Sequence, residues 1–300
     1  MSVSMAQEQN EQYGAGVDKA LVRQSFNRAA NQYDAHAVLQ REVAARMLSR
    51  LTYIRHQPER VLDAGCGTGF GVKGLCERYP QANIVALDLA EAMLKLACPS
   101  RPFWQKWRQT SVFPVCGDLD RLPLPDAAVD MVWSSLALQW SNDLRASFAE
   151  LRRVLAPGGL LMFATFGPDT LKELRSAFAR VDTQMHVNHF IDMHDMGDWL
   201  MQAGFSAPVM DMEFITLTYP DLRAMLHDLK AIGAHNVMQG RSAGLMGRAR
   251  WQVLESAMES FRQAGQLPLT YEVVYGHAWV ADVRPDVKTQ TVQWHRRVMS

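Results

Sequence analysis

The chain has 300 residues, 48% of them hydrophobic, and its 31 lysines and arginines balance its 31 aspartates and glutamates. This length allows one large α/β domain or two smaller ones, with a substantial buried core. The hydrophobic fraction excludes a disordered chain, and the charge balance excludes a histone-like basic protein or an acidic tail protein. Neutrality also gives no overall electrostatic reason to bind nucleic acid or a membrane, and we expect neither.

The cysteines and the N-terminus bear on the cellular compartment. The four cysteines, at positions 66, 76, 98 and 116, form no Cys-x-x-Cys pair. This spacing argues against a zinc knuckle, a thioredoxin-type redox site and a disulfide framework. The N-terminus has neither the apolar core of a signal peptide nor an arginine-rich transit pattern. We therefore expect a cytoplasmic protein with reduced thiols and a flexible tail over residues 1–17.

Helical periodicity begins at Asp18, and the apolar residues that carry it are interrupted at Asn31–Asp34. This pattern predicts two helices over about 18–56, joined at the interruption, as a cap on the domain that follows. Further helices are predicted at about 70–79, 90–97, 142–155, 169–181 and 194–203.

From Arg60 onward, short apolar runs bounded by turn residues predict strands. The five runs of the first half lie at 61–65, 84–88, 113–118, 129–135 and 160–166. Because they alternate with helices, the fold class is α/β, a Rossmann-like doubly wound sheet with right-handed crossovers. Two later strands, at 209–218 and 270–280, complete a seven-stranded sheet. The helical stretch 219–265 between them is predicted to be an insertion that acts as a lid on a single domain over 18–281, followed by a tail over 282–300.

A glycine-rich turn follows the first predicted strand, in the sequence Asp63–Ala64–Gly65–Cys66–Gly67–Thr68–Gly69. Glycine permits a tight turn and lets a ligand approach the backbone beside the N–H groups of a helix. Asp88 ends the second strand, where an acidic side chain can accept hydrogen bonds from both ribose hydroxyls. This order predicts a nucleoside site, and the G-x-G-x-G spacing differs from the G-x-G-x-x-G of dinucleotide enzymes.

With Gly117–Asp118 at the end of the third strand, these features resemble the class I S-adenosylmethionine-dependent methyltransferases. The hallmarks of that family are a D/E-x-G-x-G-x-G loop, an acidic residue that ends the second strand and a Gly-Asp that ends the third. The resemblance implies that S-adenosylmethionine is the cofactor, with the loop at its methionine end, Asp88 at the ribose and Asp118 at the adenine. The implied cofactor residues are Asp63, Gly65, Gly67, Gly69, Asp88, Leu89, Asp118, Leu119 and Ser135.

Longer stretches are similar to one subgroup, the malonyl-acyl-carrier-protein O-methyltransferases of biotin synthesis. They are FNRAANQYDAHAVLQREVA near the start, WSSLALQWSNDL after the fourth strand, and LKAIGAHNVMQGR and PLTYEVVYG near the end. The resemblance implies methylation of the free malonyl carboxylate on acyl-carrier protein, with S-adenosylhomocysteine as the second product. A carboxylate is costly to bury in an apolar acyl site and a methyl ester is not, so the product can prime pimeloyl and biotin synthesis as an ordinary acyl chain.

Such a transfer needs no general base, because the malonyl carboxylate is already ionised at neutral pH. Catalysis should therefore come from positioning and from the exclusion of water. The candidates for positioning the carboxylate are Tyr33, Lys230 and Arg241, and Trp140 is the candidate for the wall of the methyl site. The segment 230–250 carries basic residues and no acidic one, so we expect it to dock the acidic carrier protein.

Three histidines raise the question of a metal. His186, His189 and His194 straddle a predicted loop and helix and have no cysteine partner. We interpret them as ordinary polar residues and expect no metal.

Two other functions stay open. One is a class I methyltransferase that acts on another small carboxylate or on a hydroxyl. The other is a respiratory-complex assembly factor with hydroxylase-like activity. The basic insertion and PLTYEVVYG favour the carboxyl methyltransferase, and the lack of a transit pattern counts against a mitochondrial factor.

Overall fold

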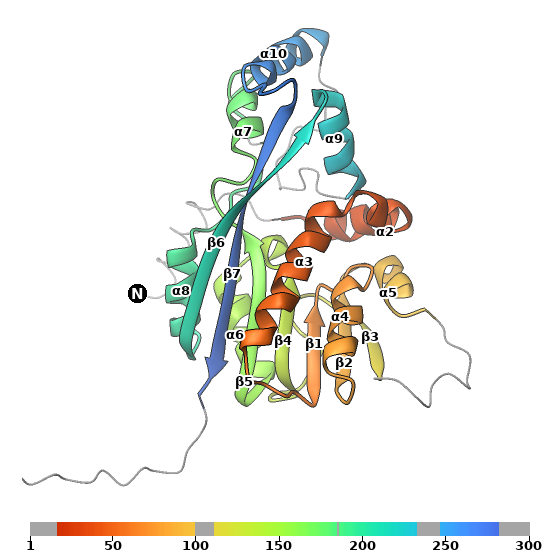
Figure 1. The fold of residues 1–300 in the computed structure, drawn as a ribbon, viewed down its shortest axis with the longest axis vertical. Helices are drawn as coiled ribbons and strands as arrows, with labels where there is room; N and C mark the ends of the chain where they lie inside the picture. Colours follow the sequence, from red (N-terminus) through yellow and green to blue (C-terminus); the bar gives the residue numbers. More distant parts are fainter. Residues whose placement is uncertain (1–16, 100–110, 185, 233–246, 282–300) are drawn as a thin grey trace, which may run out of the picture.

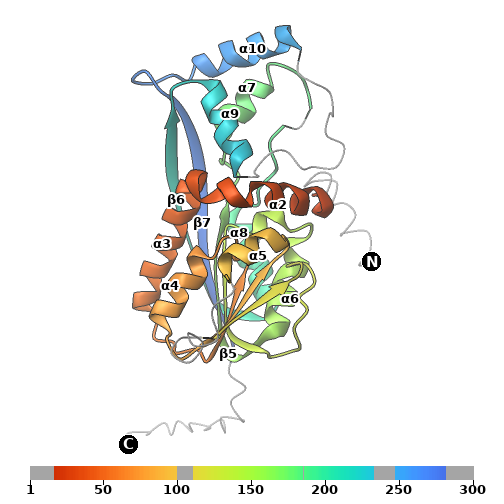
Figure 2. The ribbon, with the colours of Figure 1, turned by 90° about the vertical axis from the view of Figure 1, so that its right-hand side faces the viewer.

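The computed structural model describes residues 17–99, 111–184, 186–232 and 247–281. They form a seven-stranded sheet with the strand order β3-β2-β1-β4-β5-β7-β6, flanked by helices (Figures 1 and 2). The strands are β1 Arg60–Ala64, β2 Asn83–Asp88, β3 Val112–Cys116, β4 Val129–Ser135, β5 Leu155–Phe166, β6 Phe205–Tyr219 and β7 Leu267–Val280. The first five pair in parallel, and β7 runs antiparallel to both β5 and β6. The predicted fold class and the two late strands are confirmed.

Helices cover both faces of the sheet and its carboxyl edge. They are α2 Lys19–His36, α3 Val38–Arg50, α4 Phe70–Arg78, α5 Glu91–Ala97, α6 Leu144–Val154, α7 Lys172–Phe178, α8 Met193–Gln202, α9 Leu222–Ala231 and α10 Arg248–Glu259. One buried cluster joins α3 and α4 to the sheet, and a second joins α6 and α8 to its other face (Figure 2). Among these helices, none is long and apolar enough to cross a membrane.

The helix α6 shows how the sequence sets these elements. Its N-cap residue Asp143 accepts hydrogen bonds from the backbone N–H groups of Arg145 and Ala146, which have no partner inside the helix. Phe148 and Leu151 repeat at helical spacing and are buried against the sheet. The cap and the apolar face therefore fix the start and the orientation of the helix.

The strands β6 and β7 are the longest of the sheet and extend past the carboxyl edge of the others (Figure 1). Helices α7, α9 and α10 gather on this extension, above the end of the sheet at which α2 crosses (Figures 1 and 2). The predicted insertion 219–265 thus contains α9 and α10, and its central part lies outside the described residues.

Two predicted boundaries were wrong. The first helix does not end at Asn31–Asp34 but continues to His36, because no glycine or proline interrupts its hydrogen bonds and the N–H of Ala37 still donates to the carbonyl of Tyr33. The break falls at Ala37, whose ψ of 43° is not helical. The fifth strand begins at Leu155, directly after α6, so Pro157–Gly159 lies inside β5 instead of preceding it.

Candidate active site

The loop between β1 and α4 holds its three glycines in the left-handed region, with φ of +86°, +53° and +93° at Gly65, Gly67 and Gly69. A Cβ on Gly65 would lie 2.2 Å from the Cβ of Ala137, and one on Gly69 would lie 2.7 Å from the Cα of Ala97. A Cβ on Gly67 would meet no atom of the described residues within 4 Å. Two of the glycines therefore serve packing, and Gly67 leaves its backbone open to a ligand.

Asp88, at the end of β2, fastens this loop. Its Oδ2 accepts the N–H of Gly67 at 2.9 Å, and its Oδ1 accepts the N–H of Ala90 at 2.8 Å. Burial raises the pKa of this carboxyl, although the backbone hydrogen bonds oppose the shift. Each carboxylate oxygen has a further lone pair, so Asp88 can hold the loop and still accept a ribose hydroxyl.

Asp63 lies within β1 and is buried. Its Oδ2 and the indole Nε1 of Trp133 have no hydrogen-bond partner in the described part of the chain. A Cβ added to Gly71 would lie 2.8 Å from Asp63 Oδ2 and 3.0 Å from Trp133 Nε1. Because glycine has no side chain, the space beside these two atoms stays open. Burial, together with the negative charge of Asp88, raises the pKa of Asp63 to about 8.

This raised pKa predicts a pH-dependent stability. From about pH 4, where an unfolded aspartate ionises, to about pH 8, the folded state keeps a proton that the unfolded chain loses, so stability should fall as the pH rises. Asp63→Asn cannot ionise and should flatten that fall, which thermal unfolding of the ligand-free protein in a series of buffers would measure. An equally steep fall in the variant would assign the titration to another group.

A narrow cleft of about 80 Å³ lies at the carboxyl ends of β1, β2 and β4, under α2. Seven of the nine predicted cofactor residues line it: Gly65, Gly67, Asp88, Leu89, Asp118, Leu119 and Ser135. Tyr33 and Trp140 line it as well. Asp63 and Gly69 are not among its lining residues.

The contribution of α2 to this cleft was not predicted from the sequence. Lys19, Val22 and Phe26 line it together with Tyr33. Their spacing of three, seven and fourteen residues from Lys19 places them on one face of a helix. That spacing would have identified all three once Tyr33 had been chosen.

A larger cavity of about 730 Å³ adjoins the cleft. Four residues line both spaces: Phe26, Tyr33, Leu136 and Trp140. Trp140 meets Phe26 edge to face at 5.4 Å between ring centroids. Leu136 follows β4 with a φ of +50°, a strained conformation that non-glycine residues rarely adopt and that is often found at functional sites.

The walls of the cavity are mostly aromatic and aliphatic. They come from α2, α7, α9, β7, the end of β5 and the segment 186–190, and include Phe166, Phe178, Phe190 and Tyr271. Burial raises the pKa of Tyr33, and the charges of Asp88 and Asp34 add to the shift. Its hydroxyl therefore stays protonated at neutral pH and can donate a hydrogen bond where the two spaces meet.

The basic residues of the segment 230–250 differ in where the structure places them. Lys230 lines the cavity and is exposed, which places its charge at the opening. Arg241 lies outside the described residues. Arg248 and Arg250 begin α10, and Arg250 faces Asp182 at 3.8 Å. A cation that the prediction did not include, Arg28 of α2, also lines the cavity and is exposed.

Two of the three histidines pair with aspartates. His186 lines the cavity, stacks on Phe178 with 4.1 Å between centroids and contacts Asp182 at 2.7 Å. His194 contacts Asp192 at 2.7 Å. Within the described ranges, no group of three or more histidine, cysteine, aspartate or glutamate side chains is arranged to hold a metal ion.

Comparisons with known proteins agree with this arrangement. A family model described as a methyltransferase domain matches residues 62–163. The crystal structure of the YcgJ protein from Bacillus subtilis covers 80% of this chain and 99% of that chain, with a TM-score of 0.55 and 16% sequence identity. At this identity the likeness shows the fold alone.

Much closer relatives share nearly the whole length. A malonyl-[acyl-carrier protein] O-methyltransferase from Gallionella capsiferriformans is 58% identical over 264 residues, which span 88% of this chain and 91% of that protein. One of the same name from Nitrosospira multiformis is 51% identical over 294 residues, with 94% of this chain and 96% of that protein covered. These findings confirm the resemblance drawn from the sequence, and the chain belongs to the malonyl-[acyl-carrier protein] O-methyltransferase family.

Proposed function

We propose that this protein transfers a methyl group from S-adenosylmethionine to the free carboxylate of a malonyl thioester on acyl-carrier protein, forming the methyl ester that primes pimeloyl and biotin synthesis. The observation that carries this proposal is the meeting of the cleft and the cavity at Phe26, Tyr33, Leu136 and Trp140. A donor and an acceptor held in these two spaces would come together at that wall, with water kept out by apolar side chains.

The cleft suits an adenosyl group. Asp88 has acceptor capacity left for the ribose hydroxyls, and Gly67 leaves its backbone accessible. Asp118 and Leu119 line the same cleft, and we assign them to the adenine. S-adenosylmethionine supplies an electrophilic methyl group when it is bound. The protein needs no metal for this chemistry, because the substrate carboxylate is already an anion at neutral pH.

At the acceptor end, the chain has to orient the carboxylate without neutralising it. The protonated hydroxyl of Tyr33 donates one hydrogen bond at the junction, which orients an oxygen and leaves its other lone pairs for attack. The rings of Phe26 and Trp140 exclude water beside it. The strained turn at Leu136 places an apolar side chain at the same point.

The cavity is larger than a malonyl group needs, and its volume lies within the range of 300–1,000 Å³ typical of whole ligand sites. We assign the additional space to the pantetheine arm that carries the malonyl group. Arg28 and Lys230 lie at the opening, and neither pairs with an acidic side chain of the described residues. They are suited to the phosphate of the arm, and the segment 230–250 to the acidic surface of the carrier.

Two soluble thioesters test this assignment. Malonyl-phosphopantetheine and malonyl-pantetheine differ by one phosphate, and wild-type protein should prefer the first. Arg28→Gln and Lys230→Gln should each lower kcat/KM for the phosphorylated thioester by about five- to tenfold and leave the other thioester nearly unaffected. Lys95→Gln, which removes an exposed cation of α5, is the matched control. Equal losses on both thioesters would place these cations elsewhere than at the phosphate.

The function itself is tested with purified protein, labelled S-adenosylmethionine and malonyl-acyl-carrier protein. We expect a base-labile methyl ester on the carrier, and growth rescue of a biotin auxotroph that lacks its own malonyl methyltransferase. Methylation of free small carboxylic acids without carrier methylation would favour the broader class I activity. Cofactor binding with no methyl transfer to any of these acceptors would favour the assembly-factor alternative.

A further inference from the structure

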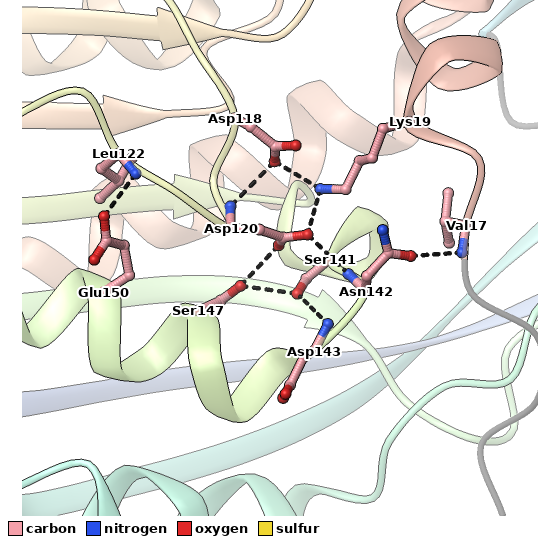
Figure 3. Close-up of polar contacts among 10 residues, drawn as sticks. All are labelled: Val17, Lys19, Asp118, Asp120, Leu122, Ser141, Asn142, Asp143, Ser147 and Glu150. Carbon is pink, nitrogen blue, oxygen red and sulfur yellow. Dashed lines mark hydrogen bonds and ion pairs between the residues drawn. The ribbon is translucent and has the colours of Figure 1, made fainter. Parts of the chain in front are cut away.

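The N-terminal end of α2 is fastened to the loop after β3 by one lysine. Lys19 Nζ lies 2.7 Å from Asp118 Oδ1 and 2.8 Å from Asp120 Oδ2 (Figure 3). All three side chains are partly buried. Burial alone would raise the pKa of Asp120, but the hydrogen bond and charge of Lys19 hold it below its ordinary value. The contact is therefore between charged groups.

Asp120 is itself held by the loop and helix that follow β4. Its Oδ1 accepts the hydroxyl of Ser147 at 2.9 Å, and its Oδ2 accepts the N–H of Asn142 at 3.2 Å (Figure 3). The side chain of Asn142 accepts in turn the N–H of Val17 at 2.6 Å, just before α2. The start of α2 is thus tied to two separate loops at the carboxyl edge of the sheet.

Between this attachment and its C-terminus, α2 covers the cleft. Lys19, Val22, Phe26 and Tyr33 of this helix line the cleft, which has a volume of about 80 Å³. A ligand held in the cleft would therefore lie beneath α2. A hinge is available at Ala37, where the helical backbone stops before α3 begins.

The same helix also forms a wall of the larger cavity, through Arg28, Gln32 and Tyr33 among others. Any movement of α2 away from the sheet would remove this wall. The cavity is therefore complete only with α2 in the position that the structure shows.

We propose that Lys19 is a latch, a positioning residue whose ion pairs with Asp118 and Asp120 hold α2 closed over the bound cofactor. Closure completes the acyl cavity, so the cofactor binds before the acyl thioester and its product leaves last. The latch rests on the contacts around Lys19 alone, and the order of binding rests also on the proposed function.

The latch is tested by measuring the rate at which S-adenosylhomocysteine dissociates. Stopped-flow tryptophan fluorescence can follow this rate, because Trp140 lines the cleft. Asp120 is not among the residues that line the cleft, so Asp120→Asn weakens the latch without removing a cofactor contact. We expect Lys19→Met and Asp120→Asn each to speed dissociation about tenfold or more. Lys19→Arg should stay close to wild type, and Lys95→Met, on α5, should not change the rate.

Unchanged dissociation in both Lys19→Met and Asp120→Asn would overturn the latch. Faster dissociation in Lys19→Met with none in Asp120→Asn would also overturn it, because Lys19 would then act through the cofactor itself. The latch is supported if both variants release the product faster while their kcat falls much less than their KM for S-adenosylmethionine rises.

The order of binding has its own measurement. With wild-type protein, S-adenosylhomocysteine should compete with S-adenosylmethionine and inhibit noncompetitively against malonyl-acyl-carrier protein. Competition against both substrates would refute the order and leave the latch standing. If no methyl ester forms at all, the proposed function fails, and the dissociation rates still decide the latch.

Discussion

Asp88→Ala should raise the Kd for S-adenosylhomocysteine by about 10- to 100-fold, which corresponds to a loss of about 1–3 kcal/mol of binding free energy. The carboxylate has two tasks, because it accepts the N–H of Gly67 and retains acceptor capacity for the ribose. Alanine removes both, and the loop that faces the ligand loses its attachment to β2. Isothermal titration would measure the affinity.

Asp211→Ala is the control for that experiment, since Asp211 is exposed on β6 and pairs with Arg50 instead of a loop residue. Its affinity for S-adenosylhomocysteine should equal that of the wild type. An Asp88→Ala protein that binds as tightly as wild type would exclude this carboxylate from the ribose site.

The second large effect separates the packing role of the glycine loop from its ligand role. Gly65→Ala places a Cβ 2.2 Å from that of Ala137 at a φ of +86°, so the clash and the backbone strain should together cost about 2–4 kcal/mol of stability. Gly67→Ala adds a methyl group to open space, so its stability should fall by about 1 kcal/mol. That methyl group occupies the cleft, so cofactor affinity should fall clearly.

Denaturant unfolding of both variants, with and without S-adenosylhomocysteine, would distinguish the packing role of Gly65 from the ligand role of Gly67. Gly65→Ala should be the less stable protein in the absence of ligand, and Gly67→Ala should gain the least stability when ligand is added. The reverse ranking would mean that the two glycines have exchanged roles, and the open space at Gly67 would not be the place where a ligand approaches.

The sequence was sufficient for those parts of the molecule that depend on local pattern. Strand runs, glycine turns and the acidic ends of β2 and β3 are encoded within a few residues, and parallel strands bring their carboxyl ends to one edge. Seven of the nine predicted cofactor residues accordingly line one cleft. Asp63, which sits within a strand and not at its end, does not line the cleft.

Contacts between distant segments were beyond such reasoning. Lys19 and Asp118 are 99 residues apart, and their pairing depends on the direction in which α2 crosses the sheet. A helix that breaks at Asn31–Asp34, as the sequence predicted, does not define this direction. The wall between the cleft and the cavity was not predicted either. It forms because α2, through Phe26, reaches both of them beside Leu136.

The extension of β6 and β7 beyond the rest of the sheet bears on how proteins with this fold can come to accept different acyl groups. The two strands pair with each other along their whole length, Phe205–Tyr219 against Leu267–Val280. The extension that carries α7, α9 and α10 is therefore continuous with the sheet (Figure 1). The cleft that we assign to the methyl donor lies at the ends of other strands, β1 to β4. If this assignment holds, substitutions in α7, α9 and α10 can change which acyl group is accepted without changing the cleft residues that come from these strands.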